Sequence, residues 1–173
     1  TVAQIDLSGT TDTNTISASG SVELANVVDT GTTTATSPVE LVVTAGTGVT
    51  LGTVTLSNTL DVDFDTATGT STLNAGSLSA GTIEVDGVGT NDVMNFGSTV
   101  VSTVAGVTIG NAGTVDLDGD VTGATTVTIS DVGTEIDLAA GVDITASGGN
   151  VDLNNTVAQI DLSGTTDTNT ISA

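Results

Sequence analysis

Carboxylates are the only ionisable side chains that this 173-residue chain offers for chemistry. It has 21 Asp and Glu residues and no Lys, Arg, His, Cys or Tyr, which gives a formal net charge of −21. Carboxylates bind hard cations through oxygen, and in pairs they act as acid and base. Zinc sites built on Cys or His, Ser–His and Cys–His nucleophiles and Walker phosphate loops are excluded, because each needs a residue type that is missing.

Two acidic clusters and one further aspartate are candidate cation ligands. In Asp116-Leu-Asp-Gly-Asp120 three carboxylates alternate around a glycine, but Val121 and Val127 stand where an EF-hand needs Gly and Glu. The candidates are Asp61, Asp63, Asp65, Asp92, Asp116, Asp118 and Asp120. Ca²⁺ is the expected ion because it takes six to eight oxygen ligands. The alternative at any one of these positions is a turn residue whose carboxylate is solvated.

The same composition argues against an enzyme and against several partners. Paired carboxylates such as Asp61/Asp63 or Asp116/Asp118 could in principle hydrolyse a glycoside, but the chain has no Trp or Tyr platform and no basic residue to bind an anionic sugar. Without a basic patch, nucleic acids and anionic membrane surfaces are repelled. Residues 93–115, the longest uncharged stretch, are too polar for a spanning helix, so no membrane insertion is expected.

Composition and local pattern predict an all-β fold. Thr, Val and Ile number 37, 24 and 9, and such β-branched side chains suit strands. Short apolar–polar–apolar triplets such as Val151-Asp-Leu153 recur along the chain between Gly-rich turns. Triplets starting at Val142, Val151 and Ile160 advance by nine residues, as successive sides of one coil would. We therefore predict a parallel β-solenoid with coils of roughly 18–28 residues; the alternative is an antiparallel β-sandwich with a donated strand.

Acidic residues occupy the centre of most of these triplets, which places them on the solvent face. Adjacent coils of a solenoid lie about 4.8 Å apart. Acids on the same side of successive coils would then form columns of like charge, with a repulsion of roughly 0.9 kcal/mol per pair in bulk water. Divalent cations, salt screening or raised carboxylate pKa values are the available remedies.

One segment occurs twice. Residues 1–18 reappear letter for letter as residues 156–173, an offset of 155 residues. The interpretation is a tandem array in which residues 1–155 form one full repeat of about six to eight coils and residues 156–173 begin the next. In the alternative, the two copies have separate roles within one domain, such as a donated strand and its displaced twin.

Two stretches carry a family resemblance. GVDITASGGNVDLNN (residues 141–155) and NAGTVDLDGDVTG (residues 111–123) resemble repeats of large bacterial surface proteins of the filamentous-haemagglutinin and autotransporter adhesin type. The resemblance implies a parallel β-helix with an extracellular, elongated structural or adhesive role. It transfers no functional residues, because such shafts are defined by their fold.

The predicted function is a structural repeat of an extracellular filament or surface fibre that stacks end to end. Its expected partners are copies of itself and divalent cations. The alternatives are a donor-strand-linked bead fibre and an adhesive or ice- or glycan-binding module. For ice binding, the local pairs Thr53/Thr55, Thr66/Thr68 and Thr126/Thr128 qualify, but they do not recur at one coil period.

Overall fold

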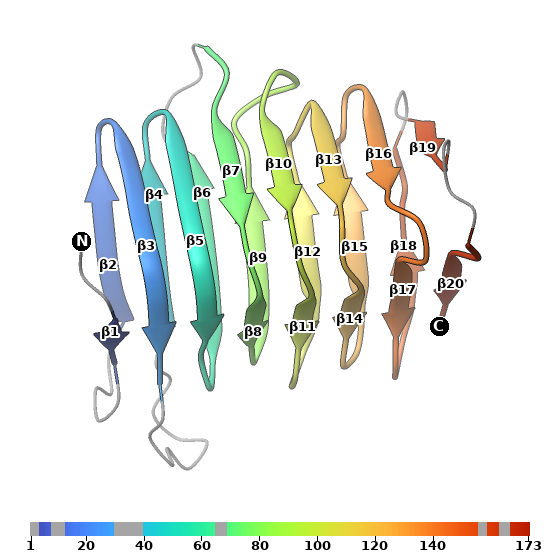
Figure 1. The fold of residues 1–173 in the computed structure, drawn as a ribbon, viewed down its shortest axis with the longest axis horizontal. Coiled ribbons are helices and arrows are strands. Elements are labelled where there is room, and N and C mark those ends of the chain that lie inside the picture. Colours follow the sequence, from blue (N-terminus) through green and yellow to red (C-terminus); the bar gives the residue numbers. More distant parts are fainter. Residues whose placement is uncertain (1–3, 8–12, 30–39, 65–68, 156–158, 163–166) are drawn as a thin grey trace.

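The computed structural model describes residues 4–7, 13–29, 40–64, 69–155, 159–162 and 167–173, and in these ranges the chain is all-β without a helix. Its strands pair in parallel and stack into a β-solenoid (Figure 1). The strands are β1 (Ile5–Asp6), β2 (Thr13–Ala18), β3 (Ser21–Val28), β4 (Glu40–Ala45), β5 (Gly48–Thr55), β6 (Thr59–Phe64), β7 (Thr72–Ala75), β8 (Leu78–Ala80), β9 (Thr82–Asp86) and β10 (Val93–Phe96). They continue with β11 (Val100–Ser102), β12 (Val107–Gly110), β13 (Thr114–Leu117), β14 (Val121–Gly123), β15 (Val127–Ser130), β16 (Glu135–Leu138), β17 (Asp143–Ala146), β18 (Val151–Asp152), β19 (Gln159–Asp161) and β20 (Thr170–Ser172).

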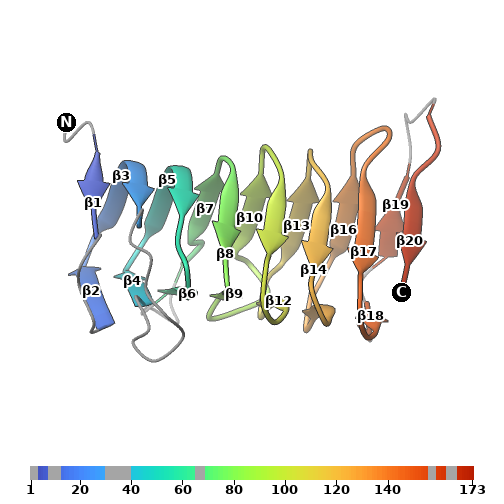
Figure 2. The same ribbon diagram turned by 90° about the horizontal axis from the view of Figure 1, so that it is seen from below.

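The solenoid has three sides, which we name after the view in Figure 1. The rear sheet contains β2, β4, β6, β9, β12, β15 and β18. The front sheet has an upper side, formed by the first halves of β3 and β5 and by β7, β10, β13, β16 and β19. Its lower side is formed by β1, the second halves of β3 and β5, and β8, β11, β14, β17 and β20. Figure 2 shows the lower side in front of the upper one.

The chain follows one route through every coil that the structure describes, from the rear sheet to the upper side and then to the lower side. In the first coils β3 and β5 are single eight-residue strands that serve both front sides. From β7 onward the front strand is divided in two, with a bend at glycines such as Gly76 and Gly97. The period shortens with it: Val22, Val49, Leu73 and Met94 are successive register partners, so the coil length falls from 27 to 24 and then 21 residues.

Aliphatic side chains fill the interior in continuous columns. Alternate residues of each strand point inward, as in the pattern of β6, where Leu60, Val62 and Phe64 are buried between partly exposed neighbours. Because the strands are in register, the inward residue of one coil stacks on that of the next, as Val107 does on Ile83 and Val127. Burial of such side chains contributes roughly 1.5–3 kcal/mol each, and it is the main stabilising term available to a chain without Cys, Lys, Arg or His.

These observations confirm the predicted fold. Strands, parallel pairing and coils of 19–27 residues all agree with the β-solenoid prediction. The nine-residue spacing marks successive sides as expected, since β17, β18 and β19 lie on the lower side, the rear sheet and the upper side. The antiparallel sandwich is wrong for the described strands, because each described pair is parallel.

Candidate functional site

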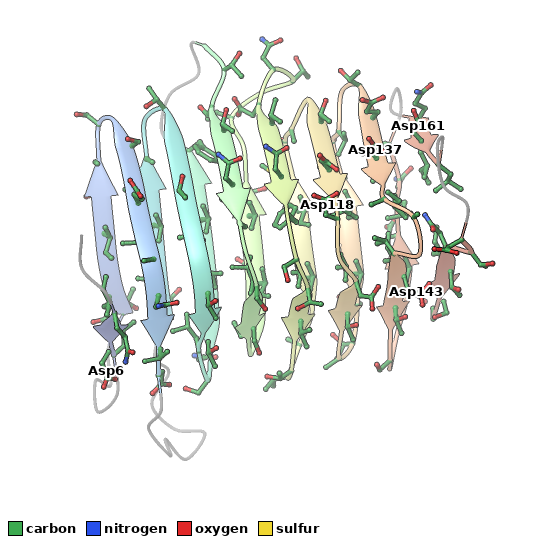
Figure 3. The ribbon with its side chains drawn as sticks, viewed as in Figure 1. Asp6, Asp118, Asp137, Asp143 and Asp161 are labelled. Carbon is green, nitrogen blue, oxygen red and sulfur yellow. The ribbon has the colours of Figure 1, made fainter. Side chains whose placement is uncertain are left out.

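The three outward faces differ in chemistry, and each is a candidate interaction surface. A solenoid presents every outward residue in a column, so the chemistry of a face depends on which residues stack. Outward positions are acidic on β6 and β9 of the rear sheet, amide and then acidic along the upper side, and rich in hydroxyls along the lower side. Figure 3 shows the labelled acids Asp118, Asp137 and Asp161 following one another along the upper half.

The rear acidic patch consists of Glu40, Asp61, Asp63, Glu84 and Asp86. Asp61 stacks on Glu84 and Asp63 stacks on Asp86, because β6 and β9 pair in register. Thr13 donates a hydrogen bond from Oγ1 to Glu40 Oε2 at 2.6 Å, and Asn111 Nδ2 donates to Asp86 Oδ1 at 3.4 Å. The patch therefore has neutral donors around it and no cationic side chain, since the chain contains none.

Asp61 lies in this patch, and its ionised form is disfavoured there. Partial burial raises its pKa to about 6, and repulsion from Asp63, Glu84, Glu40 and Asp86 adds to the effect in that order. The ionised form is therefore disfavoured in the folded state relative to the unfolded chain. The carboxylate costs stability above pH 6, and that cost is relieved as the pH falls through 6 toward the unfolded value near 4.

Replacing Asp61 with Asn should stabilise the protein at pH 7. Solvent screening reduces the expected gain to about 1 kcal/mol, or roughly 2–4 °C in Tm. The wild-type protein should gain stability between pH 7 and pH 5, and Asp61→Asn should show less of that gain. Thermal melts followed by circular dichroism across this range test the prediction, with Asp131→Asn as a control that removes one charge from a turn. Equal pH profiles for wild type and Asp61→Asn would contradict it.

The upper side carries a column that changes from amide to acid. Its successive outward residues are Thr50, Asn74, Asn95, Asp116, Asp137 and Asp161. Asn95 Nδ2 donates a hydrogen bond to Asn74 Oδ1 at 2.9 Å, so the amides form a ladder between coils. Partial burial, followed by repulsion from Asp118, Asp137 and Glu135, raises the pKa of Asp116. A column of stacked acids, as expected from the sequence, is thus present on this side.

The loop Asp116-Leu-Asp-Gly-Asp120 is spread around a corner of the coil. Asp116 lies in β13 on the upper side, Asp118 follows this strand, and Asp120 precedes β14 on the lower side. Asp120 Oδ1 accepts a hydrogen bond from the backbone N–H of Asp143 in the next coil, at 2.9 Å. Among the described residues no group of three or more carboxylates is close enough to hold a metal ion. Asp65 lies outside the described residues, so only Asp61 and Asp63 of that candidate cluster can be placed.

The Asp92 carboxylate accepts hydrogen bonds from backbone N–H groups and does not join a cluster of acids. Its side chain is 2% exposed, and Oδ1 accepts a hydrogen bond from the N–H of Ser71 at 2.8 Å. Oδ2 accepts from the N–H groups of Val88 at 2.8 Å and Gly89 at 3.2 Å. This carboxylate therefore closes its own turn and ties it to the preceding coil. Asp29 plays a similar part, accepting a hydrogen bond from the hydroxyl of Ser57.

The lower side carries two parallel columns of outward residues, most of them hydroxyls. The rungs are Thr53/Thr55, Ser77/Ser79, Thr99/Val101, Asp120/Thr122, Asp143/Thr145 and Thr170/Ser172. Hydroxyls of adjacent rungs lie 3.2 Å apart between Ser77 and Thr99 and between Thr145 and Ser172. A search for Thr pairs alone misses this face, because Ser, Val or Asp replaces at least one Thr on every rung after Thr53/Thr55. Of the sequence pairs, Thr66/Thr68 lie outside the described residues and Thr128 lies on the rear sheet.

A shallow groove marks the bend between the upper and lower sides. It has a volume of about 280 Å³ and is lined by Thr50, Leu51, Asn74, Ala75, Gly76, Asn95 and Gly97. The groove offers amide groups and glycine backbone but no acid, so it does not coincide with the rear acidic patch.

Within the described part of the chain, no helix is long and apolar enough to cross a membrane. No family model, curated protein or solved structure matches the chain.

Proposed function

We propose that the chain is a structural repeat of an extracellular filament or surface fibre in which successive repeats continue one solenoid. The observation that carries the proposal is the placement of the second copy of the duplicated segment. Its Ile160 and Ile171 stack on Ile136 and Ile144 and so extend the interior columns of the first repeat. A repeat that begins as the next coil of its predecessor needs no linker, and the resulting body is a rod.

The exposed apolar side chains of the second copy support the proposal that the solenoid continues into further coils. Leu7 in the first copy is 8% exposed, whereas the identical Leu162 is 47% exposed. Ile160 and Ile171 are also exposed, at 43% and 47%. These side chains lie at the end of the described strand order, where β19 and β20 follow β16 and β17, and another coil can cover them. Added coils would remove this apolar surface from water and add strand pairs to β18, β19 and β20.

The increase in length with the number of repeats distinguishes a continuous solenoid from a string of separate domains. Chains with one, two and three 155-residue repeats should lengthen by roughly 32 Å per repeat, with a constant cross-section in small-angle scattering. Oriented fibres should give a reflection near 4.8 Å along the axis. A radius of gyration that grows as for flexibly joined beads would overturn the proposal and favour the bead fibre.

The extracellular setting and the cation partners belong to the same proposal. The likeness of residues 111–123 and 141–155 to adhesin-type repeats supports a surface location, and an acidic shaft without basic residues suits an ion-rich exterior. Divalent cations, Ca²⁺ first among them, would neutralise the stacked acids of the rear patch and of Asp116, Asp137 and Asp161. The role proposed is structural and not enzymatic.

Calcium should stabilise the protein at low ionic strength. Bridging of carboxylates on adjacent coils offsets their repulsion, and a gain of 1–2 kcal/mol would raise Tm by about 2–8 °C. The measurement compares melts in Ca²⁺, in Na⁺ of equal ionic strength and in chelator. An unchanged Tm after chelation would show that bound metal does not neutralise the columns. The double variant Asp61→Asn/Glu84→Gln should lose part of the calcium response if the rear patch contributes.

The hydroxyl columns of the lower side favour a second candidate function, an adhesive module that binds an ordered hydroxylated surface. Regularly spaced Ser and Thr hydroxyls can match a lattice of hydrogen-bonding groups on ice or on a packed glycan. Retention of a single repeat on ice or on an insoluble polysaccharide, lost in a Thr53→Val/Thr55→Val/Ser77→Ala/Ser79→Ala variant that still folds, would support this candidate. Equal retention of the variant would contradict it.

A further inference from the structure

The two identical segments lie on different sides of the solenoid. In the first copy Ile5 stacks on Val27 on the lower side, and Ile16 stacks on Val43 in the rear sheet. In the second copy Ile160 stacks on the upper side and Ile171 on the lower side. Figure 3 shows the equivalent acids accordingly: Asp6 is at the lower edge beside β1, and Asp161 is at the upper edge.

The offset between the copies is six and two-thirds coils. The lower column runs through six complete turns from Ile5 to Ile144, by way of Val27, Val54, Leu78, Val100 and Val121. Two further sides follow before the second copy is reached, namely β18 in the rear sheet and β19 on the upper side. The repeat is therefore one side short of a whole number of coils.

Both placements put the isoleucines of the segment in line with inward residues. Ile5 and Ile16 are register partners of Val27 and Val43 in the first copy, and Ile160 and Ile171 are register partners of Ile136 and Ile144 in the second. All three sides present inward aliphatic columns, such as Leu60–Ile83 in the rear sheet, Val115–Ile136 above and Val121–Ile144 below. A short β-branched strand with one inward residue fits any of them, so the segment has no built-in preference for a side.

The route of the chain prevents a correction of the phase. After each described strand of the rear sheet the chain enters the upper side, and after each described lower strand it returns to the rear sheet. If the second copy matched the first in phase, the chain after Asp152 would bypass the upper side. The upper edge of β16 would then lose the cover that β19 provides.

We propose, building on the tandem function above, that the surface formed by β18, β19 and β20 receives the next repeat of this same chain one side out of phase. The segment corresponding to Ser21–Val28 of that repeat pairs with β18 in the rear sheet, although in the first repeat it lies in the front sheet. Its Val22 and Leu24 continue the columns of Val151 and Leu153, and its Glu23 lies beside Asp152. The apolar edge at Leu162 and Ile171 is covered by the coil that follows.

The phase shift rotates the three faces around the shaft. In the second repeat, the strands that carry the hydroxyl columns move from the lower to the upper side. The counterpart of the rear acidic patch lies on the lower side, and the counterpart of the amide–acid column lies in the rear sheet. Three repeats, about 20 coils or roughly 96 Å, return each face to its starting side. Acidic patches of neighbouring repeats are thus not aligned, and a flat partner meets the same face only once in three repeats.

Cysteine pairs can measure the phase directly, because the chain contains no Cys. Residues on adjacent rungs are about 5 Å apart, within reach of a short bifunctional thiol reagent. In the 173-residue chain, Asp137→Cys/Asp161→Cys should crosslink, because these residues are register partners, and Thr145→Cys/Asp161→Cys should not. Crosslinking of the second pair alone would place the second copy in the phase of the first and overturn the inference.

A two-repeat chain extends the test to the following strand. One variant of this chain combines Asp152→Cys in the first repeat with Glu23→Cys in the second. After treatment with the crosslinker it should lose its free thiols to the same extent as Asp137→Cys/Asp161→Cys. A second variant, which combines Asp137→Cys in the first repeat with Glu23→Cys in the second, should keep its free thiols. The reverse result would overturn the phase shift while leaving a rod, as seen by scattering, and hence the filament function intact. If neither pair reacts, the inference fails; if the scattering is also that of jointed beads, the filament function fails with it.

Discussion

Phe96→Ala is expected to lower the free energy of unfolding by about 3–5 kcal/mol, the largest effect of any single truncation considered for this protein. Phe96 is 1% exposed and stands in an upper-side column between Ala75 and Leu117. The small Ala75 makes room for the ring, so a second alanine beside it would leave a cavity that rigid stacked strands cannot close. The loss comes from transfer of the ring to water and from the empty volume.

The measurement is urea unfolding followed by far-ultraviolet circular dichroism, because the chain has no Trp or Tyr for fluorescence. Thr108→Ala is the control, since Thr108 is exposed in β12 and its truncation should change stability by no more than about 0.5 kcal/mol. Similar losses in the two variants would show that the ring is not part of a packed interior.

Gly76→Ala should destabilise the fold by about 1–3 kcal/mol, whereas Gly97→Ala should be neutral or stabilising. The two glycines follow the register partners Ala75 and Phe96 at the same bend, and their N–H groups donate equivalent hydrogen bonds to the preceding coil. A Cβ on Gly76 would lie 2.5 Å from the carbonyl oxygen of Gly52, but one on Gly97 would lie 3.6 Å from that of Ala75. Neither glycine has a positive φ, so steric space alone separates them.

Melting temperatures of the two variants, measured side by side, test this prediction. The first alanine must push apart two backbone segments that a hydrogen bond of 2.7 Å holds together between Gly76 N and Leu51 O. Gly97→Ala causes no clash and reduces the conformational entropy of the unfolded chain, which raises the free energy of unfolding by about 0.4–1 kcal/mol. Equal destabilisation by both substitutions would contradict the geometry of the bend.

The sequence was sufficient to predict the fold because its pattern repeats locally. Triplets such as Val151-Asp-Leu153 indicate one buried residue on each side of an acid, and short strands separated by glycine favour a solenoid over a sandwich. The duplicated segment and the nine-residue steps at Val142, Val151 and Ile160 indicated coils with several sides. These features depend on neighbours in the chain, which a sequence displays directly.

The stacking partners could not be predicted, because the coil length changes along the chain. Steps of 27, 24 and 21 residues from Val22 to Met94 hide which outward residues share a column. The hydroxyl face of the lower side is therefore invisible to a search at a fixed period.

The surroundings of the acidic side chains could not be predicted either. Asp116, Asp118 and Asp120 look convergent as a loop, but Leu117 is an inward strand residue and the chain then turns a corner. Asp92 resembles a ligand in sequence, while its environment supplies three backbone N–H donors. Spacing shows which acids are close in the chain, but only the fold shows toward what they point.

The contact of each coil with its immediate neighbours alone has a mechanical consequence. Tension applied to the two ends of the chain loads the hydrogen bonds of the outermost coils first. These coils then detach one after another, and the remaining coils bear no shear. Each detached coil of 19–27 residues lengthens the tether by roughly 60–90 Å while the remaining rod shortens by only about 5 Å. Such a body should therefore extend coil by coil under tension.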